Sequence, residues 1–217
     1  MDGPTLQAKI YQGYAKAAQR LGLACSQYRP TSALSSAIAA GNLVRTLQAS
    51  FNAKDFAYGK AQDYGKATWY CLADGTQLAP SDYLVRPDGV PFFIAAQQPL
   101  LPILAVECNR VVNVLRPQQQ AGVGAQGYGG DTVALETPLV TGFPASVLAG
   151  SKSDRALVNL PGDVRNPAWN VLLPELPGDV FLRIEDVITD DQAKRYVISS
   201  AELTELGWRI NAVQAET

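Results

Sequence analysis

Four carboxylates lie close together in the last quarter of the chain: Glu185, Asp186, Asp190 and Asp191. Two carboxylates can hydrolyse a glycosidic bond when one serves as acid and the other as base or nucleophile. The segment 186–192 also has the acidic texture of a calcium loop, yet it lacks the central glycine and the terminal glutamate of that loop. We therefore predict a solvated hairpin tip here.

Histidine is absent from the chain. This absence removes Ser-His-Asp and Cys-His catalysis and most transition-metal sites. The three cysteines, Cys25, Cys71 and Cys108, are widely spaced and form no CxxC motif, so we expect small buried hydrophobic residues in a reducing compartment. The sequence predicts a protein without catalytic residues, cofactor or metal.

Tyrosines and an uncharged apolar stretch are the candidates for contact with a partner. Tyr58, Tyr64 and Tyr70 recur every six residues among lysines, a pattern that suits a protein interface, the protein's own core or single-stranded nucleic acid. Residues 97–109 carry no charge before Glu107 and form either a buried strand or a contact surface. The predicted interface residues are Tyr58, Tyr64, Tyr70, Leu100, Leu101 and Ile103.

The composition of the 217 residues favours a subunit that is covered by neighbours. Charged residues make up 18%, below the usual quarter, and hydrophobic residues 47%. The net charge of −2 argues against a groove that grips nucleic acid by neutralising phosphates, but it is compatible with a channel through which DNA slides. No signal peptide or long apolar run is present, so we expect no membrane anchor.

The secondary-structure signals are mostly those of short strands. Residues 5–22 predict one amphipathic helix that begins at Thr5 and ends at Gly22. Elsewhere short apolar runs alternate with 14 prolines and 18 glycines, which is typical of β-structure. The segments 30–42 and 118–131 are rich in small residues and are predicted to be linkers or exposed loops.

The chain contains an internal repeat. Two segments begin with Ala-Thr-Trp (67–69) and Ala-Trp (168–169). Each continues as strand, acidic turn, strand, turn and strand, with a longer acidic turn in the second copy. The matched residues are Trp69 with Trp169, Asp82 with Asp179, Ile94 with Ile198, Leu104 with Trp208 and Val106 with Ile210. Such a meander buries its apolar face by curling into a small barrel or sandwich.

The repeat predicts a mainly β fold with two tandem small β-barrel or sandwich modules and an N-terminal α-helix. We expect the helix and a linker in residues 1–42 and the first module in 43–117. A Gly-rich linker, 118–135, then leads to the second module, 136–217.

Five segments carry a resemblance to a known class of proteins: TLQAKIYQGYAKAA, SFNAKDFAYGK, YGKATWY, FFIAAQQPLLPILAV and VISSAELTELGWRINAVQAE. Together they look like a virion structural protein of tailed bacteriophages, and the second repeat is similar to the head-closure or stopper barrels of phage necks. The resemblance implies a ring of six or twelve subunits between portal and tail, around the DNA exit channel. Members of that class usually carry one barrel, so two barrels leave stopper, adaptor, nozzle and tail terminator open.

The expected function is therefore that of a non-catalytic head-to-tail connector of the virion neck or tail, assembled in the host cytoplasm. Its expected partners are sister copies, the portal or adaptor, tail proteins and packaged DNA that passes without sequence-specific binding. The alternatives are another virion structural protein (a decoration, tail or baseplate subunit) and, in a different class, a carboxylate-dependent hydrolase.

Overall fold

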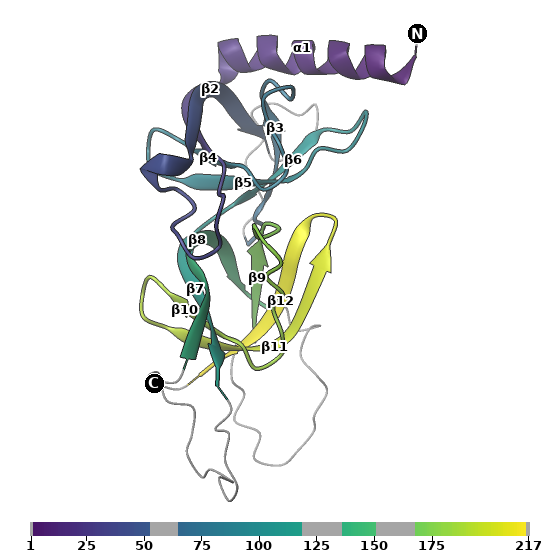
Figure 1. Cartoon of the computed structure of the whole chain (residues 1–217). Helices are drawn as coiled ribbons and strands as arrows, with labels where there is room; N and C mark the ends of the chain where they lie inside the picture. Colours follow the sequence, from purple (N-terminus) through teal and green to yellow (C-terminus); the bar gives the residue numbers. More distant parts are fainter. Residues whose placement is uncertain (1, 53–64, 119–135, 151–167, 216–217) are drawn as a thin grey trace, which may run out of the picture.

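The computed structural model describes residues 2–52, 65–118, 136–150 and 168–215. They form one N-terminal helix and two closed six-stranded barrels that follow each other along the chain (Figure 1). The prediction of a mainly β protein with an N-terminal helix and two tandem modules is confirmed.

One strand topology occurs twice. Barrel 1 contains β1 (Leu23–Tyr28), β2 (Leu43–Asn52), β3 (Thr68–Leu72), β4 (Tyr83–Val85), β5 (Pro91–Ala96) and β6 (Ile103–Glu107), with a short 3-10 helix, η1 (Ala40–Asn42), before β2. Barrel 2 contains β7 (Arg110–Pro117), β8 (Glu136–Ala149), β9 (Ala168–Leu173), β10 (Val187–Asp190), β11 (Arg195–Thr204) and β12 (Gly207–Gln214). The neighbour orders are β1-β2-β3-β6-β5-β4 and β7-β8-β9-β12-β11-β10, so β1 corresponds to β7 and each later strand to its counterpart.

Equivalent positions fill the two barrel interiors. Because side chains alternate between the faces of a strand, every second residue points inward. The buried equivalent pairs are Cys25 and Val112, Leu47 and Phe143, Ala49 and Ala145, Cys71 and Val171, Leu84 and Ile188, Phe92 and Tyr196, Ile94 and Ile198, Ile103 and Ile210, and Ala105 and Ala212. Each barrel therefore has its own apolar core.

Strand pairing confirms part of the predicted repeat. Trp69 and Trp169 occupy the same position in their barrels. Trp69 pairs with Ala105, which also pairs with Ile94. Trp169 pairs with Ala212, which also pairs with Ile198. Both barrels also carry a register shift immediately after that isoleucine, between β5 and β6 and between β11 and β12. A shared bulge at one position supports a common design for the two barrels.

The predicted match in the last strand of the repeat is wrong. Val106 pairs with Phe93, and the equivalent pair in barrel 2 is Val213 with Val197. The counterpart of Val106 is therefore Val213 and not Ile210; the match of Leu104 with Trp208 fails in the same way. The cause is the β11–β12 hairpin, which is longer than the β5–β6 hairpin.

The predicted match of Asp82 with Asp179 is also wrong. The carbonyl of Asp82 accepts a hydrogen bond from the amide of Ile94 (2.8 Å), and the carbonyl of Asp186 accepts one from the amide of Ile198 (2.9 Å). Asp186 is thus the counterpart of Asp82. The turns that follow these aspartates have the same length. Besides its longer β11–β12 hairpin, the second copy has extra residues before Asp186, between β9 and β10.

The module boundaries differ from the predicted ones. β1 belongs to barrel 1, although residues 1–42 are predicted to be helix and linker; β7 belongs to barrel 2, although residues 43–117 are predicted to form one module. The chain therefore crosses between the barrels at Cys108 and Asn109, and the predicted linker 118–135 joins β7 to β8 within barrel 2. Residues 119–135 themselves lie outside the described ranges.

The N-terminal helix, α1 (Gly3–Leu21), begins earlier than predicted. Its cap is Asp2, whose side chain accepts a hydrogen bond from the amide of Thr5 (3.3 Å), so Thr5 lies in the first turn. The last helical residue is Leu21, and Gly22 is the C-cap, as predicted. Tyr11 and Tyr14 pack on the core of barrel 1.

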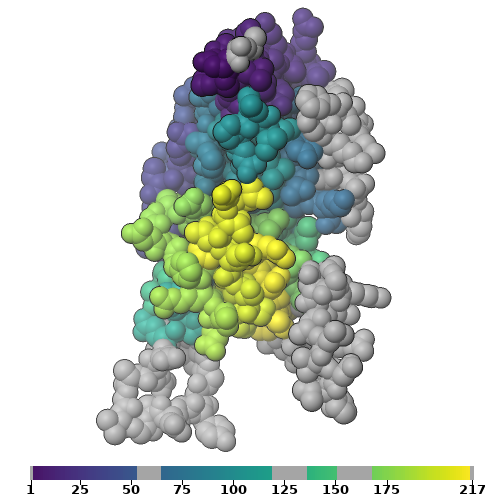
Figure 2. All heavy atoms as spheres, turned by 90° about the vertical axis from the view of Figure 1, so that its right-hand side faces the viewer, coloured from purple at the N-terminus to yellow at the C-terminus, as the bar shows by residue number. Residues whose placement is uncertain are grey.

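Residues 30–42 are not a free linker, because they bind barrel 2. The amide of Ala37 donates to the carbonyl of Gly142 (3.2 Å), and the amide of Thr141 donates to the carbonyl of Ala33 (2.8 Å). Ala37 is fully buried in an apolar cluster that spans both barrels. The barrels therefore stack end to end into an elongated molecule, with α1 over the far side of barrel 1 (Figures 1 and 2).

The prediction that the cysteines are small buried residues is confirmed, since all three are buried and free. Burial raises the pKa of Cys25 to about 11 and raises the pKa values of Cys71 and Cys108 as well. The thiolate is the reactive form. We therefore expect no rapid reaction of the native protein with Ellman's reagent at pH 8 and three equivalents after unfolding in guanidinium chloride. Rapid native reaction of even one thiol would contradict this packing.

Candidate interface

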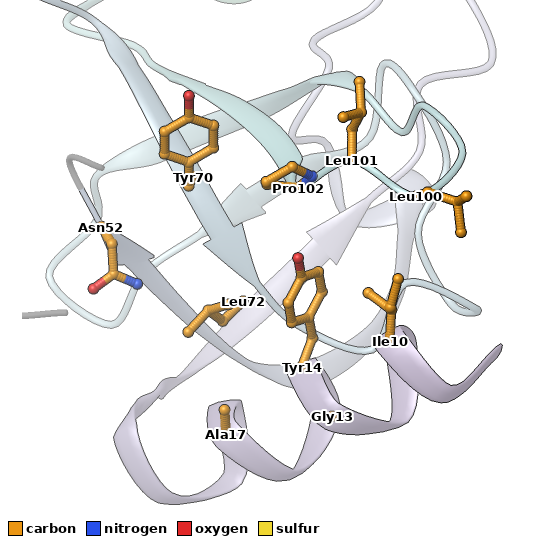
Figure 3. A pocket seen from close by; sticks show the side chains of 10 residues that line it. All are labelled: Ile10, Gly13, Tyr14, Ala17, Asn52, Tyr70, Leu72, Leu100, Leu101 and Pro102. Atoms are coloured by element: carbon orange, nitrogen blue, oxygen red, sulfur yellow. The ribbon is translucent and has the colours of Figure 1, made fainter. Parts of the chain in front are cut away.

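Three of the six predicted interface residues line one groove between α1 and barrel 1 (Figure 3). They are Tyr70 on β3 and the consecutive leucines Leu100 and Leu101 in the β5–β6 loop. The groove has a volume of about 540 Å³. Its lining, here named the α1 groove, consists of Ile10, Gly13, Tyr14, Ala17, Asn52, Tyr70, Leu72, Leu100, Leu101 and Pro102.

The helix spacing explains one wall of the α1 groove. Ile10, Tyr14 and Ala17 follow one another at intervals of four and three residues, so they share one face of α1. Gly13 lies within this wall and contributes no side chain, which leaves space between the helix and the barrel. The wall is apolar except for the tyrosine hydroxyl.

The β5–β6 loop supplies the opposite wall. Leu100 has a φ of 64°, a left-handed conformation that costs a leucine about 1–2 kcal/mol. The amide of Leu100 donates to the side chain of Gln7, and the side chain of Gln97 donates to the carbonyl of Gly75. Leu100 and Leu101 remain 46% and 51% exposed. A strained backbone that presents two exposed leucines is typical of a contact surface.

Of the other three predicted interface residues, the structure describes one, Ile103, and it does not line the α1 groove. Ile103 is fully buried in the interior of barrel 1, so its prediction as an interface residue is wrong. The alternation of β6 turns Ile103 and Ala105 inward, whereas Leu101 precedes the strand and is exposed. Tyr58 and Tyr64 lie outside the described residues.

The acidic cluster is not simply an exposed hairpin tip. Glu185 and Asp191 are exposed, as predicted, but Asp186 and Asp190 are only 2% and 5% exposed. Within the described ranges, no group of three or more His, Cys, Asp or Glu side chains converges as a metal site would require. The two buried carboxylates instead hold the backbone of barrel 2, as described next.

Asp190 closes the turn between β10 and β11. One oxygen of its carboxylate accepts the amides of Gln192 and Lys194 (both 2.9 Å), and the other accepts the hydroxyl of Tyr196 (2.9 Å). Burial and this hydrogen bond raise the pKa of Tyr196 to about 12. A carboxylate whose two oxygens are both engaged is poorly placed to act as a hydrolase acid or base.

An arginine–aspartate pair lies at the end of β1, with a buried carboxylate and a half-exposed arginine. The guanidinium of Arg29 donates two hydrogen bonds to the carboxylate of Asp82, from Nε to Oδ1 (2.7 Å) and from Nη2 to Oδ2 (2.8 Å). Oδ2 also accepts the amide of Ala79 (2.8 Å) and the side chain of Gln27 (2.7 Å). We call Arg29 and Asp82 the first Arg–Asp pair. It fixes the loop that leads into β4.

The same arrangement recurs at the end of β7. Arg116 donates from Nε to Oδ1 of Asp186 (2.8 Å) and from Nη2 to Oδ2 (2.9 Å), and the amide of Arg183 donates to Oδ2 (2.7 Å). We call Arg116 and Asp186 the second Arg–Asp pair. The residue before each aspartate, Ser81 or Glu185, has a left-handed backbone with φ near 70° (70° and 74°). The two loops therefore share one built geometry.

Sequence reasoning missed both Arg–Asp pairs, although the chain carries a signal for them. Each arginine is followed by proline, in Arg29-Pro30 and Arg116-Pro117, and each aspartate follows a buried leucine by four residues, in 78–82 and 182–186. The predicted match of Asp82 with Asp179 concealed the second part of this signal.

A second exposed apolar surface lies beside the second Arg–Asp pair. Phe181 and Ile184 are 58% and 65% exposed. The ring of Phe181 packs edge-on against Trp208, with 5.3 Å between the ring centroids, and its carbonyl accepts a hydrogen bond from Arg116 (2.8 Å). We call Phe181 and Ile184 the distal patch, because it lies at the end of β7 opposite to barrel 1.

Comparison with protein families, with curated proteins and with solved structures finds no match for this chain. Within the described ranges, no helix combines the length and the apolar composition that a membrane crossing requires.

Proposed function

We propose that this protein is a structural subunit of a tailed-phage virion, a ring-forming connector of the adaptor, stopper or nozzle type between head and tail. The observation that carries the proposal is the α1 groove, an exposed apolar surface held by an anchored loop at one end of a stack of two barrels. Groups that bind rather than react line this groove. The resemblance of the sequence to virion proteins of tailed phages supports the same assignment.

The electrostatics are consistent with a position near packaged DNA. A subunit that lines an exit channel should let DNA slide, and a strongly basic wall would bind the phosphates and hold them. The chain has a net charge of −2. In the proposal, six or twelve copies form the ring. The portal or adaptor contacts one face of the ring, and tail proteins contact the other face. DNA passes through the ring without sequence-specific binding.

The test is to locate the protein within the phage particle. We expect a peptide tag on the C-terminus, labelled with gold and imaged by electron microscopy, to appear between capsid and tail in six or twelve copies. Labels on the capsid surface or the baseplate would instead identify another virion structural protein. Absence of the protein from purified particles would overturn the proposal altogether.

A further inference from the structure

The helix α1 carries all its charges on one side. Lys9, Lys16 and Arg20 follow one another at intervals of seven and four residues, so they lie along one stripe of the helix surface. All three side chains are exposed, and α1 contains no carboxylate. Among the residues that the structure describes, none of the three has a carboxylate partner. We call them the α1 cations, and they are free to attract carboxylates from outside the chain.

Gly13 joins the stripe of α1 cations to the α1 groove. It lines the groove, and it lies between Lys9 and Lys16 on the helix surface, four residues after one and three before the other. A glycine inside a helix lowers its stability relative to alanine, yet a Cβ atom at Gly13 would meet no atom within 4 Å. The packing of this chain therefore does not require a glycine here. A partner that packs closely against α1 would require it.

The opposite wall of the groove has a conformational cost of its own (Figure 3). Leu100 keeps its left-handed backbone, and its side chain and that of Leu101 stay about half exposed. Gly13 and Leu100 thus face each other across the groove, and neither feature gains packing within the chain. Two unfavourable features on the two walls of one apolar groove indicate that a partner covers it.

A helix fits the α1 groove better than a strand or a bilayer does. Both barrels are closed in the part of the chain that the structure describes, so neither offers a free edge to which a strand could add. The side of α1 opposite to the groove presents only small or neutral residues, namely Ala8, Gln12, Ala15 and Gln19. That side lacks the large apolar side chains with which a surface helix enters a bilayer.

We infer that the α1 groove binds an acidic amphipathic helix of a neighbouring protein in the particle. This inference rests on the proposed function, and it states the chemistry of the partner at this groove. The apolar face of the partner helix packs between Ile10 and Leu101, and its carboxylates face the α1 cations. The α1 cations are about 10 Å and about 6 Å apart along the axis. Carboxylates spaced by seven and four residues on a helix aligned with α1 therefore match them.

Two designed peptides of about 18 residues, long enough to form a helix, test this contact by fluorescence anisotropy. Both carry one leucine face, and the positions that match the α1 cations are glutamates in the acidic peptide and lysines in the basic peptide. We expect wild type to bind the acidic peptide at least about tenfold more tightly, and Lys9→Glu/Lys16→Glu to reverse this preference. Absence of binding, equal affinity for the two peptides, or an unchanged preference in the double variant overturns the inference.

Variants of the groove show where the acidic peptide binds. Leu101→Gln should weaken binding by about tenfold or more, whereas Leu203→Gln is the control, because Leu203 is 44% exposed on the β11–β12 hairpin and outside the groove. Gly13→Leu should fill the groove and abolish binding while it raises the melting temperature by about 2–4 °C. A loss of binding in this variant therefore does not come from unfolding. Full binding by Gly13→Leu, or an equal loss in Leu203→Gln, overturns the inference.

Two competing probes separate a protein partner from other anionic surfaces. They are vesicles of phosphatidylcholine and phosphatidylserine and a short DNA duplex. If either probe bound wild type and Leu101→Gln abolished that binding, the groove would belong to a membrane or to DNA, and the inference would fail. Gold label at the neck without a preference between the peptides would retain the proposed function and refute this contact alone. Label elsewhere in the particle, together with the expected preference, would retain the contact and refute the proposed position.

Discussion

Replacing Asp82 with asparagine is expected to lower the free energy of unfolding by about 3 kcal/mol, because hydrogen-bond donors around the buried carboxylate lose their acceptor. The carboxylate of Asp82 is fully buried and accepts four hydrogen bonds, two of them from Arg29. Asparagine would place an NH₂ group against N–H donors whichever way its amide is turned. It would also leave the guanidinium without a counter-ion. Urea denaturation followed by tryptophan fluorescence measures the loss.

Asp88→Asn is the matched control for this prediction. Asp88 also pairs with an arginine, Arg86, but its side chain is 48% exposed. Exposed ion pairs contribute little to stability, so the control should lose less than a third of what Asp82→Asn loses. Equal losses in the two variants would mean that the burial of the Asp82 carboxylate is unimportant.

The second Arg–Asp pair should behave in the same way in barrel 2. Asp186 is 2% exposed and accepts three hydrogen bonds. We expect Asp186→Asn to destabilise the protein by about 3 kcal/mol, because donors around the buried carboxylate lose their acceptor. Normal stability of Asp186→Asn would contradict the structural equivalence of the two pairs, whatever the result for Asp82.

Truncating Tyr83 should separate the unfolding of the two barrels. Tyr83 is fully buried, lies at the barrel junction, and donates from its hydroxyl to the carbonyl of Pro144 (2.8 Å). Its ring also packs edge-on against Phe143 of barrel 2, with 6.3 Å between centroids. Tyr83→Ala is expected to lose about 3–5 kcal/mol, as do other buried aromatic residues. Calorimetry should show one transition for wild type and two for the variant.

Two further variants show whether the effect comes from the junction. Tyr83→Phe removes only the hydroxyl and leaves the buried carbonyl of Pro144 without its donor, at a cost of about 1–3 kcal/mol. Phe92→Leu changes the interior of barrel 1, where Phe92 is fully buried, and should lower stability while preserving a single transition. If Phe92→Leu also split the transition, the coupling would not depend on Tyr83.

The fold class was predictable because its signals are local. Short apolar runs between glycines and prolines predict strands, and the recurrence of Trp69 and Trp169 marks two similar units. The lack of histidine and the wide spacing of the cysteines argue against histidine-dependent catalysis and most transition-metal sites, and both features can be read from the sequence. The exposure of Leu100 and Leu101 was partly predictable too, because a segment without charges is expected either to be buried or to contact a partner.

The assignment of strands to barrels was not predictable, because strand pairing is non-local. Alternation within β7 shows which side chains share a face, but it does not show which sheet the strand joins. The same limit explains the error at Ile103, whose burial depends on the direction in which β6 enters the barrel. It also explains the missed Arg–Asp pairs, whose members are more than fifty residues apart in the chain.

Sequence alone thus established a duplicated, mainly β protein with one helix, because hydrophobic alternation, turn residues and repeats are properties of neighbouring residues. The tertiary structure decided that Tyr70, Leu100 and Leu101 meet α1 in one groove, and that Asp82 and Asp186 occupy equivalent buried positions in the two barrels. These positions relative to one another are set when the barrels close. Closure brings together side chains from strands that are far apart in the chain, so their distances and exposure depend on the tertiary structure.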